Sequence, residues 1–198
     1  MFNWLLSEKH AMTILRKDHD AVKTIFDEFK KAESPAKRKS LIHQAVNALK
    51  IHAVVEEEIF YPAIRARVGD TLMNEADEEH HVAKLLIAEL ERPVENDHRD
   101  AKFTVLAESV RHHIKEEEGE IFPKAKQLDV DFEKLGQQIL ARKKELLETG
   151  VSKDAEHITI AKARGKTDSS AAAARRRKAT GTSSRKPARK GTRHASVH

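Results

Sequence analysis

An internal repeat is the feature that most constrains how this chain of 198 residues can fold. A shift of 61 residues places His19 on His80, and places the segment 52–62 on the segment 113–123. Each copy contains a His, an HxxxE pair that begins 33 residues later, and a proline ten residues after the second His. Self-similarity at a fixed offset indicates that both halves form the same supersecondary unit.

The hydrophobic pattern within each copy is helical. Apolar residues recur every three or four positions, and nowhere do β-branched residues alternate with polar ones between turn residues. The pattern predicts helices at about 7–31, 35–69, 71–92, 99–128 and 131–149, with Ser34 as an N-cap and Gly69 and Gly150 as C-terminal stops. Four long helices with short connections predict an all-α, up-down-up-down four-helix bundle of two αα-hairpins, followed by a short C-terminal helix.

Charge divides the chain into two unlike regions. Residues 161–198 contain 12 Lys or Arg and one acid, whereas residues 1–160 contain 25 basic and 31 acidic residues. The C-terminal region has almost nothing apolar larger than alanine, so it cannot bury enough surface to order itself. We therefore expect a bundle domain at 1–150, a linker at 151–160 and a disordered, Lys/Arg-rich tail at 161–198.

Several classes of protein are excluded by composition. The chain has no Cys, which rules out disulfides, thiolate zinc sites and iron–sulfur clusters. It has no apolar run near the roughly 20 residues that span a bilayer. The start, MFNWLLSEKH, lacks the basic segment and cleavage site of a secretory signal, and its apolar residues are expected to pack on the bundle. We expect a cytoplasmic protein whose metal ligands, if any, are His and carboxylates.

The repeat also places six ionisable residues on the apolar faces of the predicted helices. A His and a Glu four residues apart lie one above the other on a helix, so each HxxxE pair presents two ligands to one side. Burying four imidazoles and two carboxylates is costly unless a pair of cations compensates them. Nitrogen and oxygen donors without sulfur favour iron, with manganese or zinc as competitors. The six residues are His19, His52, Glu56, His80, His113 and Glu117.

The arrangement H…HxxxE…H…HxxxE, from about Leu15 to Leu128, resembles the hemerythrin-like, or HHE cation-binding, family of non-haem di-iron bundles. The resemblance implies that the four histidines are terminal ligands and that the two glutamates bridge the irons. Two features depart from the invertebrate hemerythrins. Lys84 stands where they have a fifth ligand His. Glu117 follows its His by four residues, whereas the corresponding carboxylate in those proteins is an Asp five residues after its His. Reversible oxygen carriage is therefore not implied, and Tyr61, Glu57 or water is left to complete the coordination.

The remaining histidines and glutamates have simpler interpretations. His81 and His112 are rotated about 100° from the ligand face, while His10 and His43 are half a revolution away and should face outward. Four glutamates are expected to lie on a solvated acidic face, namely Glu57, Glu116, Glu118 and Glu120. One of them could instead orient a ligand His. Phe60, Phe122 and Tyr61 are expected to fill the core. Of these, Tyr61 could instead reach the metal.

Three functions are compatible with these features. The favoured one is binding of a small oxidant (O2, peroxide or nitric oxide) for sensing, storage or detoxification. The second is a peroxidase- or catalase-like enzyme in which the metals act as Lewis acids. The third is an interaction protein with a structural metal, brought to nucleic acid or another polyanion by the basic tail, which has no aromatic residue for reading sequence. The oligomeric state is left open.

Overall fold

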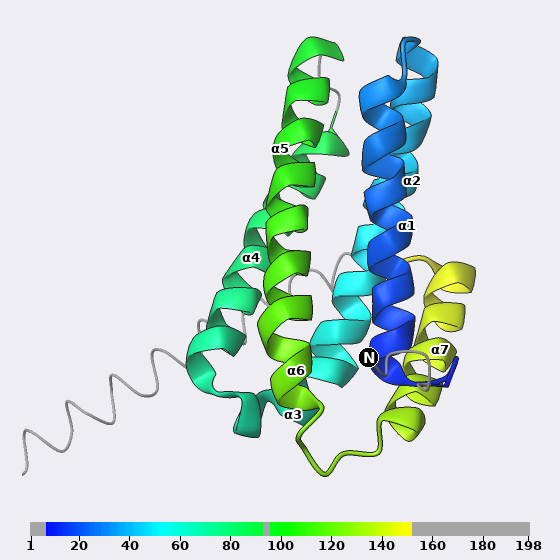
Figure 1. Ribbon diagram of the computed structural model, residues 1–198. Helices are drawn as coiled ribbons and strands as arrows, with labels where there is room; N and C mark the ends of the chain where they lie inside the picture. Colours follow the sequence, from blue (N-terminus) through cyan, green and yellow to red (C-terminus); the bar gives the residue numbers. More distant parts are fainter. Residues whose placement is uncertain (1–6, 93–95, 152–198) are drawn as a thin grey trace, which may run out of the picture. The chain divides into compact units, whose positions relative to one another are not determined.

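The computed structural model describes residues 7–92 and 96–151. The N-terminal apolar residues, most of the predicted linker and the predicted tail at 161–198 lie outside the described residues. The described residues contain helices and connections but no strand, which confirms the all-α prediction (Figure 1). None of the described helices is both long enough and apolar enough to cross a membrane.

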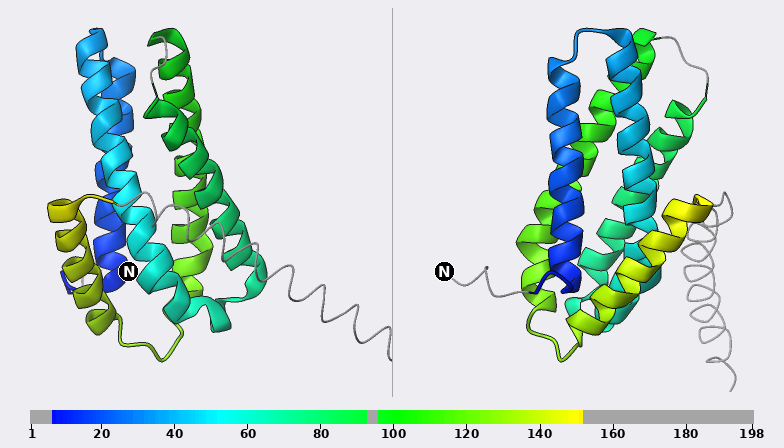
Figure 2. Two further views of the ribbon diagram at one scale, coloured as in Figure 1. Left: turned by 180° about the vertical axis from the view of Figure 1, so that it is seen from behind. Right: turned by 90° about the vertical axis from the view of Figure 1, so that its right-hand side faces the viewer.

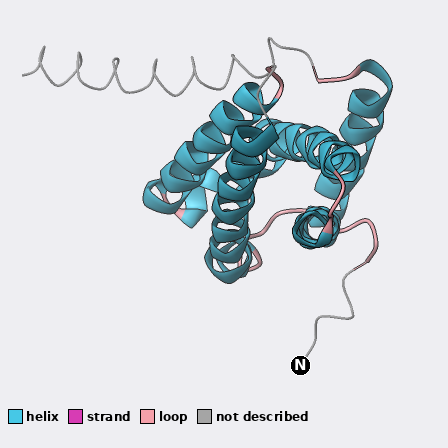
Figure 3. Ribbon diagram, turned by 90° about the horizontal axis from the view of Figure 1, so that it is seen from above, coloured by secondary structure: helices cyan, strands magenta, loops and turns pink. Residues whose placement is uncertain are grey.

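The bundle is built from two antiparallel helical pairs (Figures 1 and 2). In the first pair, α1 (Ala11–Lys31) packs on α2 (Pro35–Val55), which continues through a π-helical segment, η1 (Glu56–Phe60), into α3 (Tyr61–Val68). In the second, α4 (Asp70–Leu90) packs on α5 (Asn96–Glu116), which continues through η2 (Glu117–Ile121) into α6 (Phe122–Ala125). Viewed from above, the long helices surround a common interior (Figure 3). The shorter α7 (Phe132–Thr149) lies against α1 and α2.

Most helix boundaries follow from their capping residues. Ser34 accepts a hydrogen bond from the backbone N–H of Lys37 at 3.2 Å, and Asp131 accepts one from Lys134 at 2.9 Å. Gly69 and Gly150 have φ of 109° and 77°, the left-handed region in which a helix ends on glycine. The first helix begins at Ala11 instead of near residue 7, because α7 packs across the segment that precedes it.

The six predicted ligands lie in a layer between two apolar clusters. Along α1, Leu15 belongs to the first cluster, His19 follows it, and Val22 belongs to the second cluster. The ligands on α2, α4 and α5 have the same position relative to the clusters. Among the described residues, the buried polar or charged side chains are these six, none more than 8% exposed.

The two π-helical segments were not predicted. In η1 the backbone N–H of Tyr61 donates to the carbonyl of Glu56, five residues earlier, and in η2 Phe122 donates to Glu117 in the same way. Such wide turns are rare in proteins as a whole, and those that occur are often found at functional sites. Each one begins at the glutamate of an HxxxE pair and ends just before the repeated proline. The wider turn changes how the residues that follow the glutamate are rotated about the helix axis.

Candidate metal centre

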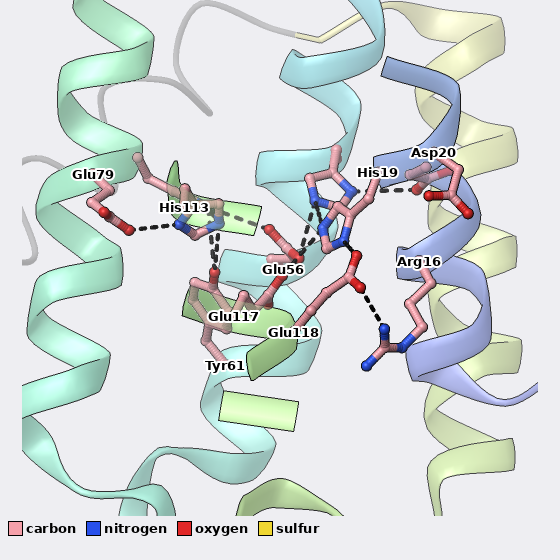
Figure 4. Close-up of polar contacts among 12 residues, drawn as sticks. Arg16, His19, Asp20, Glu56, Tyr61, Glu79, His113, Glu117 and Glu118 are labelled. Atoms are coloured by element: carbon pink, nitrogen blue, oxygen red, sulfur yellow. Dashed lines mark hydrogen bonds and ion pairs between the residues drawn. The ribbon is translucent and has the colours of Figure 1, made fainter. Parts of the chain in front are cut away.

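The structure brings all six predicted ligands together from both halves of the repeat (Figure 4). Their donor atoms form two groups, each within 4.8 Å. The first group consists of His19, His52, Glu56 and Glu117, and the second of Glu56, His80 and His113. Glu56 belongs to both groups, whereas Glu117 belongs to the first.

The histidines present their Nε2 atoms to one another and to the glutamates. The two Nε2 atoms of each His pair, 19 with 52 and 80 with 113, are 3.1 Å apart. Glu56 places Oε1 at 3.1 Å from Nε2 of His52 and Oε2 at 3.3 Å from Nε2 of His80. Glu117 places Oε2 at 3.2 Å from Nε2 of His19. Glu56 therefore offers one oxygen to each group, as a bridging carboxylate does.

These separations fit ligands that share a cation. Two donor atoms that each lie about 2.1 Å from one cation, at a right angle, are about 3.0 Å from each other. All four carboxylate oxygens of Glu56 and Glu117 are buried and none accepts a hydrogen bond of good geometry, although three of them lie 3.1 to 3.3 Å from a histidine Nε2. Buried polar atoms without partners are rare in folded proteins and indicate an ion or a water. The donor set and its orphaned oxygens both fit a pair of cations.

A carboxylate holds the outer nitrogen of each histidine. Because an Nδ1–H that donates to a carboxylate leaves Nε2 directed inward, these contacts fix the orientation that a ligand needs. The carboxylates also repeat at 61 residues, since Asp18 corresponds to Glu79 and Glu57 to Glu118. The Nδ1–oxygen pairs are His19–Glu118 at 2.8 Å, His52–Asp18 at 3.4 Å, His80–Glu57 at 2.9 Å and His113–Glu79 at 2.8 Å.

The prediction that Glu57 and Glu118 lie on a solvated face is therefore wrong, and the alternative of a carboxylate that orients a ligand His applies to both. The partner of Glu57 is on α4 and that of Glu118 is on α1, so each contact links one half of the repeat to the other. Glu120 is exposed and Glu116 half-buried, as expected for a solvated face. Asp18 and Glu79 were missed, although each directly precedes a predicted ligand His in repeat register.

Two lysines contact these orienting carboxylates. Lys84 donates to Glu57 at 2.5 Å, and Lys143, which lies on α7, contacts Asp18. Burial raises the pKa of Glu57, but the hydrogen bond from His80 and the charges of His80 and Lys84 outweigh it and lower that pKa. At the position where the invertebrate hemerythrins have a ligand His, Lys84 therefore supports the carboxylate that orients His80.

Without a cation, the buried groups hold protons on His52 and His80. Burial lowers the pKa of His52, but the charge of Glu56 and the hydrogen bond to Asp18 outweigh it and raise that pKa to about 10. His80 is likewise raised to about 9 by its contacts with Glu56 and Glu57, against the effect of burial. Burial alone would raise the pKa of Glu56, yet His52 and His80 keep it well below its usual value.

The two groups differ in one aromatic residue. Tyr61 is fully buried, as predicted for a core residue, and its hydroxyl lies 3.3 Å from Nε2 of His80 and 3.5 Å from Nε2 of His113. Phe122 has the equivalent position in the repeat and stacks on His19, with ring centroids 6.0 Å apart. Only the second group therefore has a phenolic oxygen beside its histidines.

The other described histidines lie outside the layer. His43 is exposed, as predicted, and so is His112, which contacts Glu116 at 3.1 Å. The prediction that His10 faces outward is wrong, because it is half-buried and stacks on Phe132 with ring centroids 5.3 Å apart. The reason is α7, which covers this side of α1.

The fold and the site together define a helical bundle with buried clusters of histidines and carboxylates that could hold metal cations. The sequence profile of the Hemerythrin HHE cation binding domain matches residues 10–125, and the chain belongs to this metal-binding family.

Two known proteins are similar to this chain. A crystal structure of a Hemerythrin HHE cation binding domain-containing protein from Mycobacterium kansasii has a TM-score of 0.60 at 21% identity, over 74% of this chain and 96% of that one. It confirms the fold. A protein of Nostoc sp. (strain PCC 7120 / SAG 25.82 / UTEX 2576), described as a DNA nickase, is 30% identical over 121 residues, which are 59% of this chain. The chain spans 34% of that relative's length.

Proposed function

We propose that the chain holds two iron ions in this layer and binds a small oxidant, namely O2, peroxide or nitric oxide, for sensing, storage or detoxification. The observation that carries the proposal is the set of four orphaned carboxylate oxygens facing four inward Nε2 atoms. Imidazole and carboxylate donors without sulfur suit iron, and manganese and zinc are the competing cations. His19, His52, His80 and His113 would hold the ions as terminal ligands, together with Glu56, which belongs to both donor groups, and Glu117, which belongs to the first.

The residues of the layer leave room for an external ligand. Four imidazoles and two carboxylates offer eight donor atoms, fewer than the roughly 12 that two octahedral cations take. Iron, when bound, supplies Lewis-acid and redox chemistry to a ligand that reaches it. The outer carboxylates keep the histidines aligned, and the apolar clusters on either side of the layer limit the access of water.

Metal analysis with matched histidine variants tests the proposal. Purified wild-type protein should hold about two irons per chain, and His113→Ala should lose most of this metal because it removes a buried ligand. His43→Ala, on the exposed face, should keep it. Equal loss in both variants would contradict the ligand assignment.

Optical titrations test whether a small molecule binds to the iron. Azide, nitric oxide or hydrogen peroxide should change the spectrum of the iron-loaded protein, since a coordination position is open. A spectrum that none of them changes would mean a closed, structural metal site. Sustained consumption of hydrogen peroxide would instead place the protein among peroxidase- or catalase-like enzymes.

A second candidate function, contact with nucleic acid, is favoured by the 12 Lys or Arg residues against one acid at 161–198. The description of the Nostoc relative as a DNA nickase agrees with it. The full-length protein should bind DNA with a steep dependence on salt and no sequence preference, and a chain ending at Gly150 should not. Supercoiled plasmid incubated with the metal-loaded protein tests for nicking. Equal binding by the truncated chain would contradict this candidate.

A further inference from the structure

A cavity of about 270 Å3 lies beside the ligand layer. All four ligand histidines line it, whereas Glu56, Glu117 and Tyr61 do not. The cavity is therefore on the opposite side of the histidines from the two bridging glutamates. Its far walls are buried residues of the second apolar cluster, namely Val22, Leu49, Ile87, Val110 and Ile114.

The size of the cavity exceeds what a small oxidant needs. A water molecule has a share of roughly 30 Å3 in the liquid, so O2 or hydrogen peroxide occupies a small part of this space. An apolar protein cavity of about 150 Å3 is sufficient to bind benzene. A space of about 270 Å3 with aliphatic walls therefore fits an organic molecule larger than benzene.

The charges around the cavity select a neutral ligand. The residues that line the cavity include two acidic side chains, Asp18 and Glu79, and two basic ones, Lys84 and Lys143, so their formal charges cancel. Lys143 contacts Asp18. Lys84 contacts Glu57, which does not itself line the cavity. Glu79 accepts a hydrogen bond from Nδ1 of His113. Because each of these side-chain charges has a partner, an anionic group that lies against the walls of the cavity would find no uncompensated Lys or Arg there and would lose its hydration.

Some of the residues that line the cavity are exposed to solvent. Ala48 on α2 and Leu147 on α7 both line it and are both exposed, the latter at 71%. An alanine at this position leaves space that a larger side chain would fill. The same cavity therefore has both exposed lining residues and the four ligand histidines in its wall.

We propose that this cavity binds the hydrocarbon part of a neutral organic hydroperoxide, with its O–OH end directed toward the histidine layer. The inference rests on the proposed function and specifies the oxidant of the same site. The aliphatic walls take the alkyl or aryl group, and the histidine layer is the polar end of the cavity. Hydrogen peroxide would leave most of the apolar volume unfilled, which gives an organic hydroperoxide the larger contact.

Binding of cumene, which has no oxygen, tests the cavity by titration calorimetry on the full-length, iron-loaded protein. Cumene should bind the wild type, and Ala83→Phe should weaken binding at least tenfold, because Ala83 lines the cavity and packs on the second cluster. Its neighbour Val82 is 46% exposed and does not line the cavity, so Val82→Phe should bind cumene like the wild type. Val110→Phe fills the cavity from a different helix, α5, and should repeat the loss, so that misfolding of one variant cannot account for the result.

Two further ligands separate the possible results. 4-Isopropylbenzoate, which has the same hydrocarbon with a charge, should bind at least tenfold more weakly than cumene, and equal binding would overturn the neutral class. Cumene hydroperoxide should change the iron spectrum at lower concentration in the wild type than in Ala83→Phe, and this difference should be larger than the one found with hydrogen peroxide. If hydrogen peroxide changes the spectrum but cumene does not bind, the cavity inference is wrong and the proposed function stands. If cumene binds but no peroxide changes the spectrum, the hydroperoxide assignment is wrong, and the proposed function is also wrong if nitric oxide and azide leave the spectrum unchanged.

Discussion

Tyr61 and Phe122 have equivalent positions in the two repeats, yet only Tyr61 brings an oxygen to the ligand layer. Its hydroxyl is 3.3 Å from Nε2 of His80, which matches the spacing of two ligands on one cation. Burial, together with the charges of Glu117 and Glu56, raises the pKa of Tyr61 well above its ordinary value in the metal-free protein. A cation beside the hydroxyl would oppose this shift, because it favours the phenolate.

Replacement of Tyr61 by Phe tests whether this oxygen coordinates iron. We expect the variant to keep iron, since the six other ligands remain, and to lose a visible phenolate-to-iron charge-transfer band. Tyr61 is the single tyrosine of the chain, so such a band has one possible source. A wild-type spectrum without the band, or a band that persists in the variant, would show that Tyr61 is not a ligand.

The orienting carboxylates give a second prediction. Glu57→Gln and Glu118→Gln each remove the charge that holds one ligand His, and each should weaken metal binding about 10- to 100-fold. Competition with a chelator measures the loss. Glu120→Gln, at an exposed position near the same helix end, should have the affinity of the wild type. If Glu120→Gln weakens binding equally, the effect comes from the net charge of the region.

The sequence predicted that these six residues lie together because a spacing of four on a helix is a strong geometric constraint, and the repeat supplied it twice. Glu57 was predicted to lie on a solvated acidic face, which is the simplest interpretation of neighbouring glutamates on one helix. That interpretation takes no account of α4, on which the partner His80 lies, or of the π-helical segment that begins at Glu56. His10 was misassigned for the same reason, since α7 covers a face that is exposed in an isolated hairpin.

Metal binding should release protons, which is the third prediction. In the metal-free protein the pKa of His52 is about 10 and that of His80 about 9, so both are protonated at pH 7.5. A cation needs the neutral imidazole and must displace these protons, so its affinity should fall as pH falls. Calorimetric titrations in two buffers with different ionisation enthalpies should therefore give different heats. Equal heats would contradict the protonation derived from the buried contacts.

Removal of the metal should lower the melting temperature in a pH-dependent manner. The folded-state pKa values of His52 and His80 are raised above the unfolded value of 6.5, so these groups stabilise the metal-free fold fully below that pH. This stabilisation is lost as pH rises through about 9 to 10. Chelated protein should melt below loaded protein at pH 7, and the difference should widen toward pH 9.5. A melting temperature unchanged by complete removal of metal would show that the layer is hydrated.

The last prediction concerns how α7 is held on the bundle. Gly136 is buried on α7, and a Cβ there would overlap the carbonyl oxygen of Lys9 and lie 2.9 Å from the backbone nitrogen of Ala11. Gly136→Ala must therefore displace one of the two backbones, at a cost of about 1–3 kcal/mol that exceeds the roughly 1 kcal/mol gain in helix propensity. Gly119→Ala is the control, because nothing lies within 4 Å of its added Cβ. Urea denaturation should show a loss of stability in the first variant and none in the second. Equal stability of the two would mean that α7 is not in close contact with the start of α1.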